Sequence, residues 1–67
     1  MYLQPYVAKY PNLSSVQQTI IANIPLTIPP AERIAFTNDV NNAWTVVSAM
    51  ELLLRFLGKS TLERIFP

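Results

Sequence analysis

The amino-acid sequence predicts a small all-α protein, on the basis of three observations. Its 67 residues give room for one core, so residues 1–67 are expected to form a single helical domain. In the second half, apolar residues recur in alternating steps of four and three, the period of one helix face. Capping residues and prolines divide the chain into segments of helical length. We expect a short helix, a long amphipathic helix and a short C-terminal helix, at about residues 14–24, 30–57 and 61–66.

The N-terminal segment, residues 1–11, carries three tyrosines at a spacing of four, namely Tyr2, Tyr6 and Tyr10. Pro5 and Pro11 interrupt this segment, and proline restricts both its own φ and the conformation of the residue before it. We therefore expect an extended arm with at most one helical turn. Because tyrosine is enriched at interfaces, the arm is predicted to contact a partner. The alternative, which we favour because so small a core needs every apolar group, is that the arm covers the core of its own chain.

The first predicted helix is expected to begin at one of two overlapping capping boxes, Ser14 with Gln17 or Ser15 with Gln18. Its apolar stripe consists of Leu13, Val16, Ile20 and Ile24. Pro25 is expected to end the helix within the two residues that precede it.

The long helix is predicted from a stripe made of Phe36, Val40, Ala43, Val47, Met50, Leu54 and Leu57. Residues 31–57 would extend roughly 40 Å at about 1.5 Å per residue. The middle of this segment is rich in asparagine, threonine and aspartate, which compete for backbone hydrogen bonds and form helices poorly. The alternative is therefore a break near residues 38–42, with Asp39 or Asn41 capping a second helix.

Gly58 is the only glycine of the chain and is predicted to end the long helix in a left-handed cap. Ser60 and Glu63 then form a third capping box, which is expected to start the C-terminal helix.

The composition predicts that part of the apolar surface is covered by a partner. Hydrophobic residues make up 51% of the chain and charged residues 13%, about half the usual charged share. The expected cover is a second copy, another protein or a membrane. Nucleic acid is not favoured, because the five basic residues are spread along the chain and only Arg55, Lys59 and Arg64 lie moderately close together.

The residues that carry most enzyme chemistry are scarce. Histidine and cysteine are both missing, and the four carboxylates are separated by 7, 12 and 12 residues, so no two share one turn of a helix. A single glycine cannot make a phosphate-binding loop. We therefore expect no catalysis, no metal site and no cofactor.

The second half of the long helix is the predicted working surface. Residues 49–57 are apolar nearly all round, so one short neighbour cannot cover them. Trp44 lies at the edge of the stripe, on the side that carries the charged pair Glu51 and Arg55. We predict Trp44, Leu52 and Phe56 as anchors, Glu51 and Arg55 as a polar rim, and Tyr2, Tyr6 and Tyr10 as a second contact. The alternative for Trp44 is a partly buried core residue.

The sequence therefore predicts a cytoplasmic, non-catalytic protein–protein interaction module, such as an accessory subunit, an adaptor or an inhibitor, with self-association as one form of its activity. The segment before Pro11 has no basic region followed by an apolar run, so no secretory signal is expected. The alternative is a membrane-associated subunit with residues 43–58 at the bilayer interface. Spanning is not expected, because the apolar run 43–57 has 15 residues and contains two charges, whereas about 20 apolar residues are needed.

Overall fold

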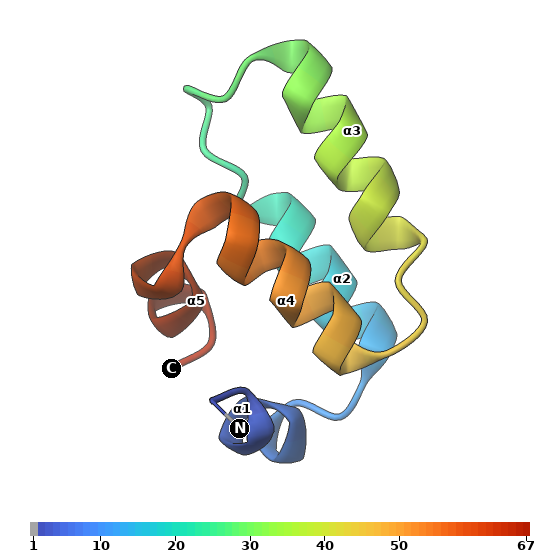
Figure 1. Cartoon of the computed structure of the whole chain (residues 1–67), viewed down its shortest axis with the longest axis vertical. Helices are drawn as coiled ribbons and strands as arrows, with labels where there is room; N and C mark the ends of the chain where they lie inside the picture. Colours follow the sequence, from blue (N-terminus) through green and yellow to red (C-terminus); the bar gives the residue numbers. More distant parts are fainter. Residues whose placement is uncertain (1) are drawn as a thin grey trace.

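The computed structural model describes residues 2–67 and is all-helical over that range (Figure 1). Its helices are α1 (Gln4–Lys9), α2 (Leu13–Ala22), α3 (Pro30–Asn41), α4 (Val46–Leu57) and α5 (Lys59–Ile65). The predicted all-α fold is confirmed.

Helices α2 and α4 lie against each other at the centre, and α3 packs on both of them (Figure 1). Helix α5 folds back on α4, and α1 lies beside the C-terminal residues. The largest fully buried side chains come from α2, α3, α4 and α5, and are Val16, Ile20, Val40, Met50, Leu53 and Leu62. Burying each such side chain contributes about 1.5–3 kcal/mol to stability. Because these side chains come from four helices, the four helices share one core.

The N-terminal arm is helical, and the expectation of an extended arm was wrong. Pro5 lies in the first turn of α1, where its missing N–H removes no intrahelical hydrogen bond. Leu3, just before this helix, is 3% exposed and belongs to the core. Burial of Leu3 therefore stabilises α1 against the core, which the spacing of the prolines did not indicate.

The N-cap of helix α2 lies two residues before Ser14 and three before Ser15, the two serines predicted to cap it. The Asn12 side chain accepts a hydrogen bond from the Ser15 amide at 3.0 Å and is the N-cap. Ser14 and Ser15 therefore lie inside the first turn and cap nothing. Pro11 immediately precedes the cap, and Asn12 takes the extended conformation that a helix N-cap needs. The C-terminal end at Ala22 agrees with the position that Pro25 predicted.

The predicted long helix is two helices, because the chain leaves the helical conformation at residues 42–45. The alternative of a break was right in kind but placed the break and its cap too early. Thr45 is the N-cap of α4 and accepts a hydrogen bond from the Ser48 amide at 3.1 Å, so neither Asp39 nor Asn41 has that role.

A tertiary contact holds the end of α3. The side-chain amide of Gln17, on α2, lies 3.0 Å from the Val40 carbonyl oxygen and 3.3 Å from that of Ala43. The Asn41 carbonyl oxygen is also within reach, at 3.4 Å. The Val40 carbonyl oxygen also accepts from the Ala43 backbone N–H at 3.1 Å, so the Gln17 amide adds a second donor at the end of α3.

The break also changes which side of α4 faces the core. The buried residues of this helix are Val46, Ala49, Met50 and Leu53. Val47, Leu54 and Leu57, which the continuous stripe placed at its centre, are only half-buried. Phe36 and Val40 on α3 are buried as predicted. The predicted stripe therefore matches the buried face of α3. In α4 the buried face is rotated away from the predicted stripe, because the two helices do not share an axis.

Arg33 fixes the linker between α2 and α3. Its guanidinium group donates hydrogen bonds to the carbonyl oxygens of Pro25 at 3.1 Å and Ile28 at 3.2 Å. These contacts hold the proline-rich segment against the start of α3.

Gly58 joins α4 to α5 with the positive φ that the sequence predicted, at 94°. Its ψ of 169° lies outside the left-handed helical region, in a part of φ/ψ space that essentially only glycine adopts. Helix α5 starts directly after it, at Lys59, so the expected start at the Ser60 capping box was wrong. Within residues 2–67, no helix has both the length and the apolar character needed to cross a membrane.

Replacing Gln17 with alanine is expected to lower the free energy of unfolding by about 1–2 kcal/mol, because the carbonyl oxygens at the end of α3 and in the linker after it lose a side-chain donor. Urea unfolding checks this. Gln18→Ala is the matched control, since the Gln18 amide reaches only the Ser14 hydroxyl, at 3.4 Å, and its loss should change stability by less than about 0.5 kcal/mol. Equal losses in the two variants would show that the Gln17 contact has no special role.

Gly58→Ala is expected to cost about 1–3 kcal/mol through backbone strain alone. A Cβ atom at this position would meet no other atom within 4 Å, so a steric clash contributes nothing. Ser60→Ala serves as the control and should be close to neutral, because Ser60 is exposed and is not the N-cap of α5. Thermal unfolding of both variants distinguishes strain from loss of a cap, and a neutral Gly58→Ala would contradict the strained geometry.

Candidate functional site

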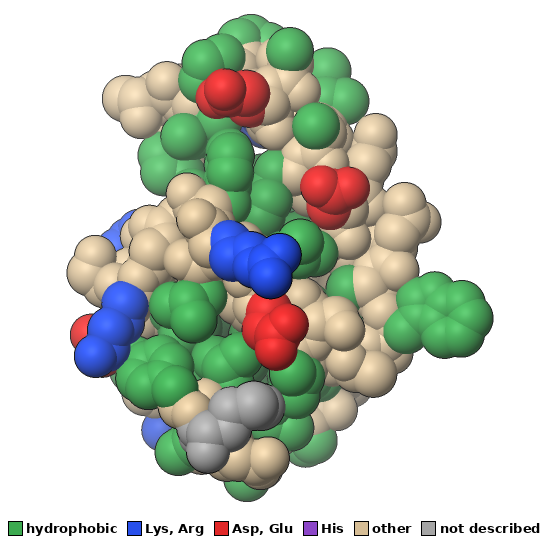
Figure 2. Space-filling model, viewed as in Figure 1, with side chains coloured by type: hydrophobic (Ala, Val, Ile, Leu, Met, Phe, Trp, Pro, Cys, Tyr) green, Lys and Arg blue, Asp and Glu red, His purple; other side chains and the backbone are tan. Residues whose placement is uncertain are grey.

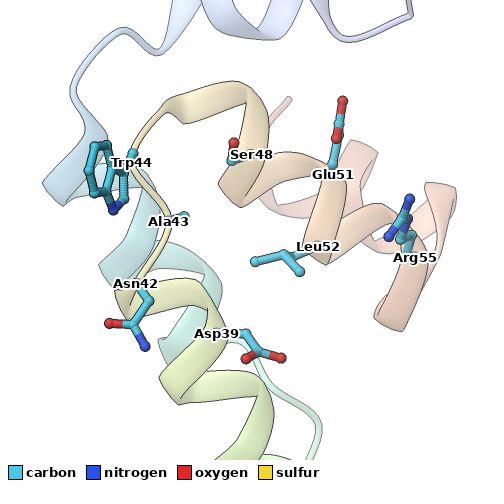
Figure 3. Close-up of a pocket in the computed structure, with 8 residues that line it drawn as sticks. All are labelled: Asp39, Asn42, Ala43, Trp44, Ser48, Glu51, Leu52 and Arg55. Atoms are coloured by element: carbon cyan, nitrogen blue, oxygen red, sulfur yellow. The ribbon is translucent and has the colours of Figure 1, made fainter.

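An open groove of about 720 Å³ lies where α3 ends and α4 begins (Figure 3). We call it the α3–α4 groove, and its lining residues are Asp39, Asn42, Ala43, Trp44, Ser48, Glu51, Leu52 and Arg55. In Figure 3 the side chains of Leu52 and Asp39 extend into the space between the two helices. The groove therefore depends on the break at residues 42–45, because a continuous helix would leave no groove between α3 and α4.

Trp44 stands at the end of this groove and is 91% exposed. It belongs to the four-residue linker, and the following residue, Thr45, has the extended conformation of an N-cap. The indole ring projects from this linker (Figure 3). The alternative assignment of Trp44 to the core is therefore wrong, and a large aromatic surface is left facing outward.

The other groove residues supply an apolar side and a polar rim. Leu52 is half-buried on α4, while Glu51 and Arg55 are exposed on the same helix. Asp39, from α3, adds a second carboxylate that was not predicted as a site residue. Asp39 lines the groove because α3 ends just after Asp39 and α4 then folds back beside it. The helix-breaking composition of residues 37–42 was the signal that could have indicated this.

Phe56, the third predicted anchor, does not line the groove. Its ring stacks on that of Phe36, with 4.5 Å between the ring centroids and 21° between the planes. Phe56 is 38% exposed, so one part of the ring is covered by α3. This pair joins α3 to α4, which makes Phe56 a support for the groove.

The three tyrosines pack against α5 and the C-terminal residues of their own chain. The Tyr2 hydroxyl donates to Glu63 Oε2 at 3.0 Å, and the Tyr10 hydroxyl donates to the Pro67 carbonyl oxygen at 2.8 Å. The Tyr6 ring lies 5.8 Å from that of Tyr2. The groove and the arm are therefore built from different helices, and a second contact through the arm stays a prediction.

Charged side chains are sparse on the surface of the protein. Figure 2 shows hydrophobic side chains reaching the surface in several places between isolated acidic and basic ones. Apart from Trp44, the most exposed large apolar side chains are Leu26, at 93%, and Ile34, at 62%, and neither lines the groove. Among residues 2–67, no three acidic, histidine or cysteine side chains gather closely enough to hold a metal ion.

No protein-family model matches the chain, and neither the curated proteins nor the solved structures contain a significant match to it. Function is therefore inferred from the geometry of the groove and of the residues around it.

The contact between α1 and α5 includes a phenol with a shifted pKa. Desolvation, followed by hydrogen bonding with Tyr6 and Glu63, raises the pKa of Tyr2 above its ordinary value of about 10. The neutral phenol donates to Glu63, whereas a phenolate would face that carboxylate with a like charge. The Lys59 ammonium group lies 4.9 Å from the centre of the Tyr2 ring and adds a cation–π contact.

This shift predicts an alkaline loss of stability. A pKa that is higher in the folded than in the unfolded chain contributes stability below the ordinary pKa, and the contribution is lost as the pH rises through the folded value. Above about pH 10, the wild type should therefore lose stability more steeply with pH than Tyr2→Phe, which lacks the titrating group. Urea midpoints of both proteins, measured at a series of pH values, check this, and parallel curves would contradict the shift.

Proposed function

We propose that the protein is a non-catalytic protein–protein interaction module that binds its partner through the α3–α4 groove, as an accessory subunit, an adaptor or an inhibitor does. The observation that carries this proposal is the 91% exposure of Trp44 at the end of the groove. Indole is a large apolar surface, and water is an unfavourable environment for it.

Covering Trp44 would contribute a large share of the energy of a specific contact. An aromatic side chain buries about 150–250 Å², which at about 25 cal/mol per Å² corresponds to about 4–6 kcal/mol before the costs of association. Tryptophan and arginine are also the residues most enriched at the energetic centres of interfaces. Trp44 and the half-buried Leu52 therefore supply the anchors, and the exposed Glu51 and Arg55 supply a polar rim.

A membrane-interface role for residues 43–58 has less support. The apolar side of α4, which contains Val46, Met50 and Leu53, faces the protein core and is buried. The side that faces outward carries Glu51 and Arg55. Helices that lie in a bilayer interface present an apolar face to the lipid.

Trp44→Ala is expected to abolish capture of the protein partner while leaving the fold intact. The indole is not part of the core, so far-ultraviolet circular dichroism and the urea midpoint should stay close to the wild type. Affinity capture from a lysate of the source cells, followed by mass spectrometry, identifies any protein that the wild type retains and Trp44→Ala does not.

Leu26→Ala is the matched control for this experiment. Leu26 is equally exposed, at 93%, but it lies in the linker between α2 and α3 and does not line the groove. This variant should retain the same partner as the wild type. The proposal fails if Trp44→Ala retains every protein that the wild type retains, or if Leu26→Ala loses the same ones.

A further inference from the structure

We infer that residues 2–10 form a detachable strap, which opens as one unit while α2–α5 stay folded and uncovers an apolar recess beside α5. The strap consists of α1 with Tyr2 and Leu3 before it and Tyr10 after it. It is built from residues that do not line the α3–α4 groove, so its opening does not depend on the proposed function. Three features carry the inference: a core that is assembled without α1, the contacts that keep the strap closed, and the position of the hinge.

The core is assembled without α1. Helix α2 packs on α4, α4 packs on α5, and α3 packs on both α2 and α4, whereas α1 belongs to none of these closely packed pairs. None of the residues of α1 itself is buried. Figure 1 shows α1 at one end of the molecule, beside the C-terminal residues. The other helices therefore keep their mutual contacts when the strap opens.

Within the strap, only Leu3 is buried in the core. Tyr6 and Val7, on α1, are half-buried at the edge of the core. Isolated helices shorter than about 12–15 residues are marginal in water, so the six residues of α1 stay helical only while the strap is closed. The helix and its contacts with the core are therefore lost together.

The polar contacts of the strap lie at the surface, where water competes for the same groups. Tyr2 donates to Glu63, and all the atoms of this hydrogen bond are exposed. Lys9 and Tyr10 both donate to the Pro67 carbonyl oxygen, again at exposed positions. Segments with few buried apolar contacts and with exposed hydrogen bonds open at a lower free energy than the core does.

The hinge lies at Pro11 and Asn12, between the strap and α2. Asn12 has the extended conformation of an N-cap. Its side chain accepts from the Ser15 amide at 3.0 Å, so the cap of α2 comes from the segment that stays with the core. Because this cap does not involve the strap, α2 keeps its first turn when α1 leaves.

Opening of the strap uncovers apolar side chains beside α5. The Tyr10 ring lies edge-on to that of Phe66, with 5.1 Å between the centroids, and Phe66 is 2% exposed. The two residues border a recess of about 300 Å³, which Val16 of α2 and Ile65 of α5 also line. When Tyr10 leaves, the recess loses one wall and Phe66 loses the ring beside it. The tyrosines of the strap contact their own chain in the closed form, so a contact between the arm and a partner requires the open form.

Native-state hydrogen exchange, followed by nuclear magnetic resonance, tests this inference. The Val7 amide donates to the Leu3 carbonyl oxygen at 3.0 Å. The Tyr10 amide donates to the Tyr6 carbonyl oxygen at 2.8 Å, so both amides report on the strap. Val7 and Tyr10 should have similar protection factors, at least about tenfold below those of the slowest amides of α2 and α4, because they exchange through a smaller opening.

Two variants separate opening of the strap from unfolding of the whole chain. Ile20→Val weakens the core at a fully buried position of α2 and should lower the protection of α2 and α4 amides by about 2–10-fold. In this variant the Val7 and Tyr10 amides should keep their wild-type protection. Leu3→Ala removes the buried side chain of the strap and should lower the protection of these two amides by at least about tenfold, with the helical chemical shifts of α2–α5 retained.

Protection of Val7 and Tyr10 equal to that of the slowest amides of α2 and α4 overturns the inference, because the strap then opens only when the whole chain unfolds. A clear difference in protection between Val7 and Tyr10 overturns opening as one unit and shows fraying from the end. A Leu3→Ala chain that loses the helical shifts of α2–α5 also overturns the inference, because the core then depends on the strap.

Discussion

The side-chain amide of Gln17 reaches from α2 to the carbonyl oxygens where α3 ends, and this contact ties α2 to the point at which the chain turns from α3 toward α4. It donates to the carbonyl oxygens of Val40, near the end of α3, and of Ala43, in the linker, and the Val40 oxygen also accepts from the Ala43 backbone N–H. With these carbonyls bonded, the chain can leave the helix at residues 42–45 and fold α4 back onto α2 and α3. A helix of roughly 40 Å could not share one core with a 10-residue partner, so ending α3 at Asn41 is what permits a compact packing.

The candidate site follows from the same break. Stopping the helix creates a groove between the end of α3 and the face of α4, and it leaves Trp44 in the linker instead of on a helix. Phe36 and Phe56 stack on each other and hold the two helices on either side of the groove. Few residues of the chain are charged, so few charged side chains surround the exposed indole of Trp44. Stability and the proposed recognition therefore depend on one local feature of the fold.

Helical periodicity predicted the fold class and the core of α2 and α3, because repeated apolar spacing reports directly on burial. It misplaced the core of α4, since the stripe was followed through residues 42–45 as though the helix were continuous. The cap contacts also differed: Asn12 and Thr45 start helices for which Ser14, Ser15, Asp39 or Asn41 were expected. Four of the predicted site residues, Trp44, Glu51, Leu52 and Arg55, are brought together in the groove, and Phe56 is not. Gln17 and Asp39 could not be assigned from local sequence, because their roles come from contacts between helices.

Nuclear magnetic resonance of residues 42–45 tests whether the chain breaks between α3 and α4 beside Gln17 and so presents Trp44 in the linker. We expect an extended-type Cα shift at Thr45, between helical shifts on both sides, together with nuclear Overhauser contacts from the Gln17 side-chain amide to residues 41–43. Helical shifts that run without interruption through residues 42–45, with a Gln17 amide that shows no contact to α3, would contradict it.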